Sequence, residues 1–483
     1  MRTFIRSIIA VLAISVALPV SAKPAGAEPL MLDEVLTTVR QNYPPLLAAW
    51  VQQDIANGRV RQAQGAFDPI VSGALAMSPM NYYDGTHGGL FVEQPLAAGG
   101  ANIYGGYRLS SGFLPDYERK VRTAEGGEAV LGMRIPLLRD RDIDSRRAGV
   151  GKAAVDRELA NPFILRQYLT FHRSARIAYY NWLAAGKRLA VAEDVLEIAM
   201  KRDGALKEQV KMGAIARITA TDNRRLVVSR EISVLNARRA FEAASIELSL
   251  FHRDVSTGDP ITPSRTRLPK DFPTITLPDS MQLINDRGNA AFRRPESREI
   301  ELLITKAGID RRLARNNLKP NLDLAVEFNQ ALGSGRPADI DESEITGLLK
   351  FSVPIGNNES KGRIASIEGE LKRLDEQKKF TRERILADAN DAFSALQATH
   401  EALERAGVNV ALAVELETAE NEKFAQGASD LLALQIREQA TFDARVLEID
   451  AKLARLKAMA DYQAAVAADA FIPPSGKTAR KGS

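Results

Sequence analysis

The sequence predicts a mostly α-helical protein that also carries transmembrane β-strands. One unit, a strand pair followed by a very long coiled-coil helical hairpin, is predicted to occur twice. Three observations support this fold class. Residues 320–355 alternate between apolar and polar side chains, two long stretches show helical periodicity, and matching features recur at a constant offset along the chain.

Residues 320–355 are predicted to form a β-hairpin. Each of its strands places apolar residues on one face and polar residues on the other, across a loop of turn-forming residues at 333–343. A membrane-facing ribbon and a hairpin packed on helices in a soluble protein alternate in the same way, so the pattern alone leaves both open. The apolar residues are Leu322, Leu324, Val326, Phe328, Leu349, Phe351, Val353 and Ile355, and the polar ones are Asn321, Asp323, Glu327, Asn329, Lys350 and Ser352.

The N-terminus has the features of a secretory signal peptide. A basic start with Arg2 and Arg6 precedes an apolar run, residues 8–20, that is too short to span a bilayer. Small residues permit cleavage after Ala22 or, alternatively, after Ala27, so a signal peptide is predicted over residues 1–22. Nothing later in the sequence resembles an apolar transmembrane helix, so this chain would have to enter a membrane through strands.

The composition excludes several classes of function. The 483 residues include no cysteine, which excludes disulfides and thiolate metal sites. The net charge of +4 gives no argument for a nucleic-acid partner, and the polar basic tail at residues 470–483 is expected to be solvated. No nucleophile motif is present, and His87, His172, His252 and His400 are scattered without metal-ligand spacing. We therefore predict no enzymatic activity and no cofactor, and expect His172 on a helix surface.

The chain is predicted to be a duplication. A helical segment at residues 30–66 is interrupted at Pro44, which matches Pro295 downstream, and a strand follows both Pro69 and Pro320 at the same offset. A constant offset indicates two copies of one unit rather than chance similarity. The predicted repeats cover residues 30–255 and 279–469, and the proline-rich stretch 256–278 is the linker between them.

The first repeat carries an insertion between Gly88 and Gly112. Its glycine-rich centre at residues 97–100 predicts an additional hairpin, with Tyr104 and Tyr107 as candidate aromatics at a membrane interface. A nucleotide-binding loop is disfavoured, because no Gly-Lys-Ser/Thr follows and no helix begins there. The sequence leaves open whether the insertion extends an existing strand pair or forms a flap.

Both repeats continue into long helical stretches, near residues 145–253 and 360–468. Apolar residues in the second stretch follow three-four spacing, which is typical of coiled-coil seams. A limb of about 65 residues would reach about 100 Å, far beyond the needs of an ordinary globular domain.

Taken in order, these parts resemble the TolC family of outer-membrane channel proteins, over essentially all of residues 30–468. The matching pieces are the proline after each opening helix, the strand-exit motifs at residues 133–136 and 351–355, and an apolar or aromatic residue three positions before Gly213 and Gly427. The resemblance implies a homotrimer in which four strands per chain close a β-barrel that continues as an α-helical periplasmic tunnel. This sequence has six candidate strands and so departs from the four strands per chain that the resemblance implies.

The resemblance also implies a function. The protein would be the exit duct of a tripartite efflux or type I secretion system, would lie in outer-membrane lipid of a bacterium, and would have a periplasmic adaptor and an inner-membrane transporter as partners. The alternative is a non-transporting periplasmic coiled-coil scaffold, whose strands would form a small sheet covered by helices. Neither the substrate nor the energy source of the transporter can be predicted from the sequence.

The turns at Gly213 and Gly427 are the predicted periplasmic tips, because glycine tolerates the positive φ that such a turn requires. By resemblance, acidic and basic residues after the glycine form a pore constriction, and the candidates are Arg217, Asp222 and Asp430. Helix capping is the alternative role for Asp222 and Asp430, and Ser429 could also cap the helix that starts at Leu431.

Overall fold

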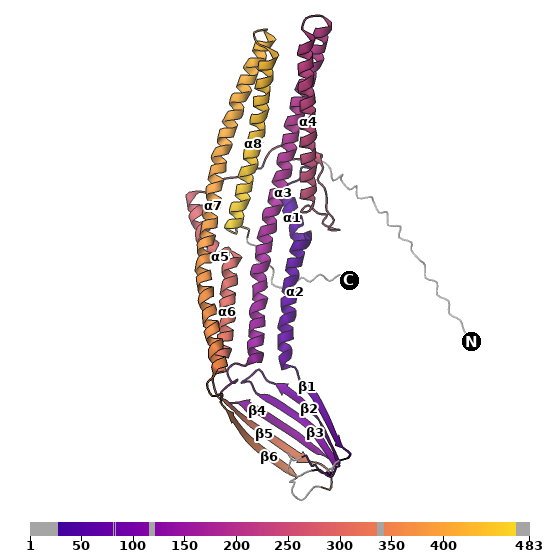
Figure 1. Ribbon diagram of the computed structural model, residues 1–483, viewed down its shortest axis with the longest axis vertical. Coiled ribbons are helices and arrows are strands. Elements are labelled where there is room, and N and C mark those ends of the chain that lie inside the picture. The colour runs from indigo at the N-terminus through magenta and orange to yellow at the C-terminus, as the bar shows by residue number, and fades with distance from the viewer. Residues whose placement is uncertain (1–27, 81, 83, 115–120, 336–341, 470–483) are drawn as a thin grey trace, which may run out of the picture.

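The computed structural model describes residues 28–80, 82, 84–114, 121–335 and 342–469. The predicted signal peptide and basic tail lie outside the described residues. Long helices form a layer, and a single sheet continues this layer at the end opposite two helical-hairpin tips (Figure 1).

Each half of the chain opens with a short helix and a longer one. These are α1 (Leu32–Asn42) and α2 (Pro44–Gln64) in the first half, and α5 (Ser280–Arg293) and α6 (Pro295–Asn316) in the second. The residue before each proline is extended, as the proline ring requires, and each proline occupies the first turn of the next helix, where it loses no hydrogen bond. The predicted helix breaks are confirmed. A short 3-10 turn, η1 (Gly65–Phe67), follows α2.

The two longest helices are α3 (Ser145–Lys211), with 67 residues, and α7 (Asn358–Ala425), with 68. At 1.5 Å per residue each is about 100 Å long, as the sequence predicts. The return helices α4 (Arg217–Ser249) and α8 (Leu431–Ala465) are about half as long. The linker that joins α4 to α5 includes the 3-10 turn η2 (Arg265–Arg267).

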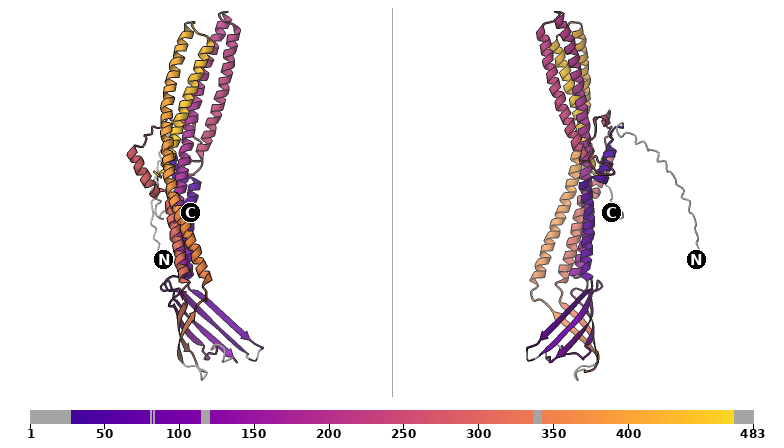
Figure 2. Two further views of the ribbon diagram at one scale, coloured as in Figure 1. Left: turned by 60° about the vertical axis from the view of Figure 1, so that its left-hand side comes forward. Right: turned by 90° about the vertical axis from the view of Figure 1, so that its right-hand side faces the viewer.

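Helix contacts define one order across the layer. Near the sheet the order is α2, α3, α6, α7, and near the tips it is α4, α3, α8, α7. The layer therefore has two lateral edges, one formed by α2 and α4 and the other by α7 (Figures 1 and 2). A core cluster joins α1, α3, α4 and α8 midway along the layer, with Trp182 and Leu183 fully buried. None of the described helices is both long and apolar enough to cross a membrane.

The sheet is antiparallel and has six strands in the order of the sequence. The insertion supplies two complete internal strands, so it is neither an extension of an existing pair nor a flap. The last strand ends at Ser352, earlier than the predicted Ile355, because Pro354 has no N–H to donate to a ladder. The strands are β1 (Ile70–Ser78), β2 (Gly85–Pro95), β3 (Asn102–Gly112), β4 (Glu128–Pro136), β5 (Asn321–Ala331) and β6 (Ser343–Ser352).

Candidate functional site

One face of the sheet, which we call the apolar face, carries no charged side chain on any of its strands. The strand register aligns these residues from β1 to β6, and Leu75, Leu131 and Leu349 are 58–70% exposed. A soluble protein rarely exposes a continuous apolar surface of this extent. The large residues of the apolar face are Val71, Leu75, Met77, Leu90, Val92, Ile103, Tyr107, Leu109, Leu131, Met133, Ile135, Leu322, Leu324, Val326, Phe328, Ile345, Leu349 and Phe351.

The opposite face, which we call the charged face, holds every ionisable side chain of the six strands except the tyrosine Tyr107. It is partly covered by its own side chains: Glu128 is 7% exposed and Asn329 is 4% exposed. Arg108 of β3 pairs with Glu128 of β4. The charged residues of this face are Glu93, Arg108, Glu128, Arg134, Asp323, Glu327, Glu344 and Lys350, with His87 beside them.

Aromatic rings lie flat along the charged face over glycines of the neighbouring strand. Tyr104 stands opposite Gly132, where a Cβ would come within 2.2 Å of the ring, and its hydroxyl donates a 2.8 Å hydrogen bond to Glu327 on β5. Phe91 lies in the same way over Gly106. Glycine is required at both positions because a side chain would displace the ring.

The two tyrosines of the inserted hairpin, Tyr104 and Tyr107, lie on opposite faces of the sheet. Tyr107 lies on the apolar face, where its hydroxyl donates a 2.7 Å hydrogen bond to the carbonyl oxygen of Gly126. Tyr104 lies on the charged face, so the prediction that it is a membrane-interface aromatic was wrong. The two residues are three positions apart, and an odd separation in a strand places side chains on opposite faces.

The sheet and the helical layer end at the same two lateral edges. Strands β1 and β6 each have a neighbour on one side only, and β1 follows α2 while β6 leads into α7. The helices that form these edges carry exposed apolar residues at helical spacing. They are Leu47, Val51 and Ile55 on α2, Val228, Ile232, Leu235 and Ile246 on α4, and Phe380, Val408, Leu412 and Leu416 on α7.

Both helical-hairpin tips turn at glycine. Gly213 has φ 73° and Gly427 has φ 76°, in the left-handed region that other residues rarely adopt. The turns belong to the same end of the molecule (Figure 1). The backbone N–H of Met212 hydrogen-bonds to carbonyl groups of Glu208 and Val210 at the end of α3, and that of Gln426 hydrogen-bonds to those of Glu422 and Phe424 at the end of α7.

The candidate constriction residues occupy different positions at the tips. Arg217 is the first residue of α4, and Asp222 lies within α4, 44% exposed, 3.5 Å from Arg225. Ala216 occupies the N-cap position, so Asp222 does not cap α4. Asp430 does cap α8, accepting a 2.8 Å hydrogen bond from the N–H of Ala433.

A buried ion pair joins the two long hairpins below their tips. Arg202 of α3 donates two hydrogen bonds to the carboxylate of Glu438 on α8, and their side chains are 12% and 6% exposed. The guanidinium of Arg230 on α4 lies 5.3 Å from the centre of the Phe442 ring on α8. These contacts hold the hairpins side by side. Sequence reasoning missed the pair because its partners lie 236 positions apart.

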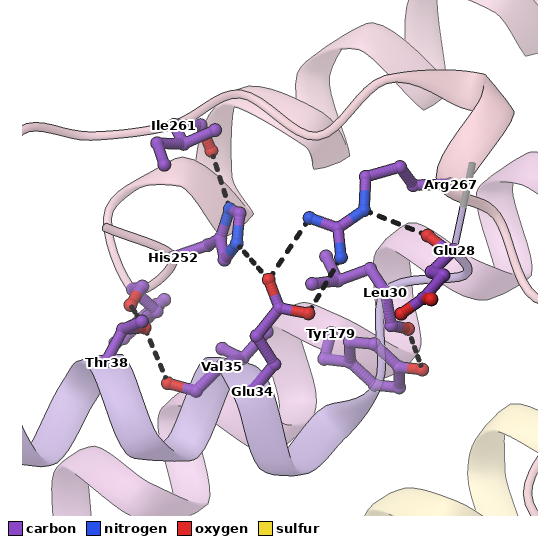
Figure 3. A network of polar contacts seen from close by, with 10 residues as sticks. Glu28, Leu30, Glu34, Val35, Thr38, Tyr179, His252, Ile261 and Arg267 are labelled. Atoms are coloured by element: carbon purple, nitrogen blue, oxygen red, sulfur yellow. Dashed lines mark hydrogen bonds and ion pairs between the residues drawn. The ribbon is translucent and has the colours of Figure 1, made fainter. Parts of the chain in front are cut away.

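Glu34 of α1 fixes the linker to the middle of the layer (Figure 3). Its carboxylate accepts hydrogen bonds of 3.1 and 2.7 Å from Arg267 and lies 3.1 Å from Nε2 of His252. Burial alone would raise the pKa of Glu34, but these hydrogen bonds outweigh it and hold the pKa below its ordinary value. Tyr179 adds a 2.9 Å hydrogen bond to the carbonyl oxygen of Leu30.

His172 is buried, so the prediction of a surface position was wrong. It is 2% exposed, its ring centre lies 3.9 Å from that of Tyr168, and its Nε2 atom has no hydrogen-bond partner. Together with Asp33, Arg176 and other residues it lines a pocket of about 280 Å³. Burial, and secondarily Arg176, lowers the pKa of His172 to about 4. Within the described residues, no cluster of ligands could hold a metal ion.

No family model matches the sequence, and the search of curated proteins gave no match. The structure is similar to the MtrE outer-membrane channel of Neisseria gonorrhoeae, with 16% identity, a TM-score of 0.62 and coverage of 90% of this chain and 88% of that one. It is also similar to the outer-membrane protein VceC of Vibrio cholerae, with 14% identity, a TM-score of 0.63 and coverage of 90% of this chain and 95% of that one. The CmeC outer-membrane channel of Campylobacter jejuni is similar with 12% identity, a TM-score of 0.62 and coverage of 90% of this chain and 85% of that one.

The elongated helical layer and the antiparallel sheet are the architecture that this chain shares with these outer-membrane channels. More particularly, the chain has the fold of the TolC-type outer-membrane channel proteins. The predicted fold class is thereby confirmed.

Proposed function

We propose that three copies of this chain assemble into a passive exit channel in the outer membrane of a bacterium. The strands cross the membrane, and the helical layers form a tunnel in the periplasm. Substrates reach the channel from an inner-membrane transporter through a periplasmic adaptor protein. The observation that carries the proposal is the confinement of every charged side chain of the strands to one face of the sheet, which leaves the other face apolar and exposed. In a membrane, such a sheet places its apolar face against lipid and its charged face against water.

The edges of one copy support closure with other copies. An open strand edge in lipid leaves backbone groups unpaired at a cost of several kcal/mol each. Because the strands alternate in direction and their number is even, β6 of one copy runs antiparallel to β1 of the next. The apolar residues of α2 and α4 would meet those of α7 in the same step, and such a head-to-tail contact generates a ring. The number of copies, three, follows the TolC-type channels.

The scaffold alternative requires helices that cover the apolar face. Leu75, at 70% exposed, and Phe351, at 63% exposed, lie on that face without such cover. The two functions predict different behaviour in cells. A channel sediments with the outer membrane as a detergent-resistant trimer and conducts ions in planar bilayers, whereas a scaffold is released by osmotic shock. A freely soluble monomer would overturn the proposed function.

A cysteine pair tests the contact between copies, since the natural sequence has no cysteine. Ser72→Cys on β1 is combined in turn with Ser352→Cys and Lys350→Cys on β6, all on the charged face near the helices. We expect oxidation of at least one pair to give a covalent trimer on denaturing gels. Each single variant serves as the control and should give no covalent trimer. The absence of cross-linking in both pairs would contradict closure through these edges.

We further propose that Asp222, with Arg217, contributes to a constriction at the tips. A ring of carboxylates favours cations, so Asp222→Ala should raise the closed-state conductance and weaken cation preference in planar bilayers. Asp430→Asn is measured beside it, because asparagine keeps the helix cap, so that any change in conductance there reports the lost charge of Asp430 alone. Unchanged conductance and selectivity in Asp222→Ala would remove Asp222 from the constriction.

A further inference from the structure

The inserted hairpin β2–β3 is built as part of the sheet on both of its faces. On the apolar face, Leu90 and Val92 of β2 stand beside Gly73 and Val71 of β1 in the same register as the rest of the sheet. On the charged face, Tyr104 of β3 reaches across Gly132 to Glu327 on β5. A flap outside the sheet would need neither the alternation of apolar and polar side chains nor the contacts with β1, β4 and β5.

The width of the six strands matches the width of the helical layer. At a spacing of about 4.8 Å and a tilt of about 40°, six strands occupy about 38 Å of a barrel wall. Four helices at the level of α2, α3, α6 and α7, spaced about 9 Å apart, occupy about 36 Å. Four strands alone would occupy only about 25 Å. With the hairpin included, the sheet and the helical layer of each copy therefore have about the same width around the channel axis.

From this we infer that the exit of the channel is a wide, water-filled barrel of eighteen strands, to which each of three copies contributes all six of its strands. The inference rests on the proposed trimer. The same geometry gives a backbone diameter of about 36 Å, compared with about 24 Å for twelve strands, because diameter grows nearly linearly with strand number.

The side chains of the charged face leave this barrel open. Phe91 and Tyr104 are its large aromatic residues on the inserted hairpin, and both lie flat over glycines instead of projecting from the wall. Acidic residues outnumber basic ones among the charged side chains of this face. The exit would therefore be open to large hydrated solutes and would have a lining of net negative charge.

Electron cryomicroscopy of the purified full-length channel tests the inference directly. We expect a cross-section of eighteen strands with β2 and β3 in the wall. A trimer with a twelve-stranded wall and the hairpin outside it would overturn this inference and leave the proposed function intact. A soluble monomer would overturn both.

Labelling provides a second test that needs no image of the barrel. His87→Cys and Leu90→Cys lie on the same strand, on the charged face and the apolar face respectively. In proteoliposomes, a membrane-impermeant maleimide should label His87→Cys at least tenfold faster than Leu90→Cys, because lipid would cover the second. Equal labelling would show that the hairpin is surrounded by water on both faces and would contradict the inference.

A deletion variant gives the matched control for width. Replacing residues 79–127 by a short glycine-serine turn joins β1 directly to β4, and the two strands keep their opposite directions. The trimer should persist with a barrel diameter reduced by about one third. An unchanged diameter would contradict a wall that includes the hairpin, and the labelling test decides the question independently if the variant fails to fold.

Discussion

The two halves of the chain have helices of nearly equal length but different numbers of strands. α2 and α6 have 21 and 22 residues, α3 and α7 have 67 and 68, and α4 and α8 have 33 and 35. The first half contributes four strands to the sheet and the second only two. The helical layer thus requires helices of matching length in the two halves. The sheet, in contrast, accepts additional strands that keep its register and its alternation of apolar and polar side chains.

The largest expected effect comes from placing a charge on the apolar face in either half. Leu90→Arg in the inserted hairpin and Leu349→Arg in β6 should both abolish membrane-inserted trimers, since arginine in the lipid-facing midplane costs about 2–4 kcal/mol per copy. Leu348→Arg is the control, because Leu348 is similarly exposed but lies on the charged face. Trimer yield in outer-membrane fractions measures the effect. A tolerated Leu90→Arg would show that the hairpin does not face lipid.

The next effect concerns the ion pair that joins the halves. Arg202→Ala leaves Glu438 buried without its partner, so the free energy of unfolding should fall by about 3–5 kcal/mol. The double variant Arg202→Met, Glu438→Leu removes both charges and should recover most of that loss. Thermal unfolding of both variants in detergent measures the difference. If the double variant were no more stable than the single one, the loss would not come from an unpaired buried charge.

A third prediction uses the buried histidine of the first half. His172 and Ile385 stand at equal distances from the starts of α3 and α7, and both are 2% exposed. Between pH 6.5 and about 4 the unfolded chain binds a proton that folded His172 does not, so stability falls as the pH drops through this range, by about 3 kcal/mol in all.

His172→Ile copies the second half and should remove this pH dependence. Melting temperatures at pH 7, 5.5 and 4.5 provide the measurement, with His400→Ala as a control at a more exposed histidine of α7. An equal loss of stability in His172→Ile and in the unsubstituted protein between pH 7 and 4.5 would assign the pH dependence to other groups.

The smallest effect is expected at Glu34, the third residue of α1, whereas the third residue of α5 is the uncharged Gln282. Because the folded pKa of Glu34 is depressed, its contribution is complete above the ordinary value of 4.5 and is lost as the pH falls through the folded pKa. Glu34→Gln should therefore cost about 1 kcal/mol at pH 7 and nothing well below the folded pKa. Denaturant unfolding at pH 7 and pH 3 measures this, and an equal cost at both values would exclude an ionic contribution.

Sequence periodicity predicted the strand pair and the long helical hairpins because both patterns are local. The place of the inserted hairpin was not predictable in this way, since it depends on pairing with β1 and β4. The face of Tyr104 followed from its odd separation from Tyr107 and could have been predicted. The burial of His172 could not, because Asp33 and Asp469, which line its pocket, come from segments far away in the sequence.

Strand direction restricts how a sheet of this kind can change. β1 leaves the helical layer and β4 returns to it, so any strands inserted between them must come in antiparallel pairs. Across related chains, the aperture would therefore vary in discrete steps of one hairpin per subunit. Point substitutions would alter its lining but could not produce an intermediate width.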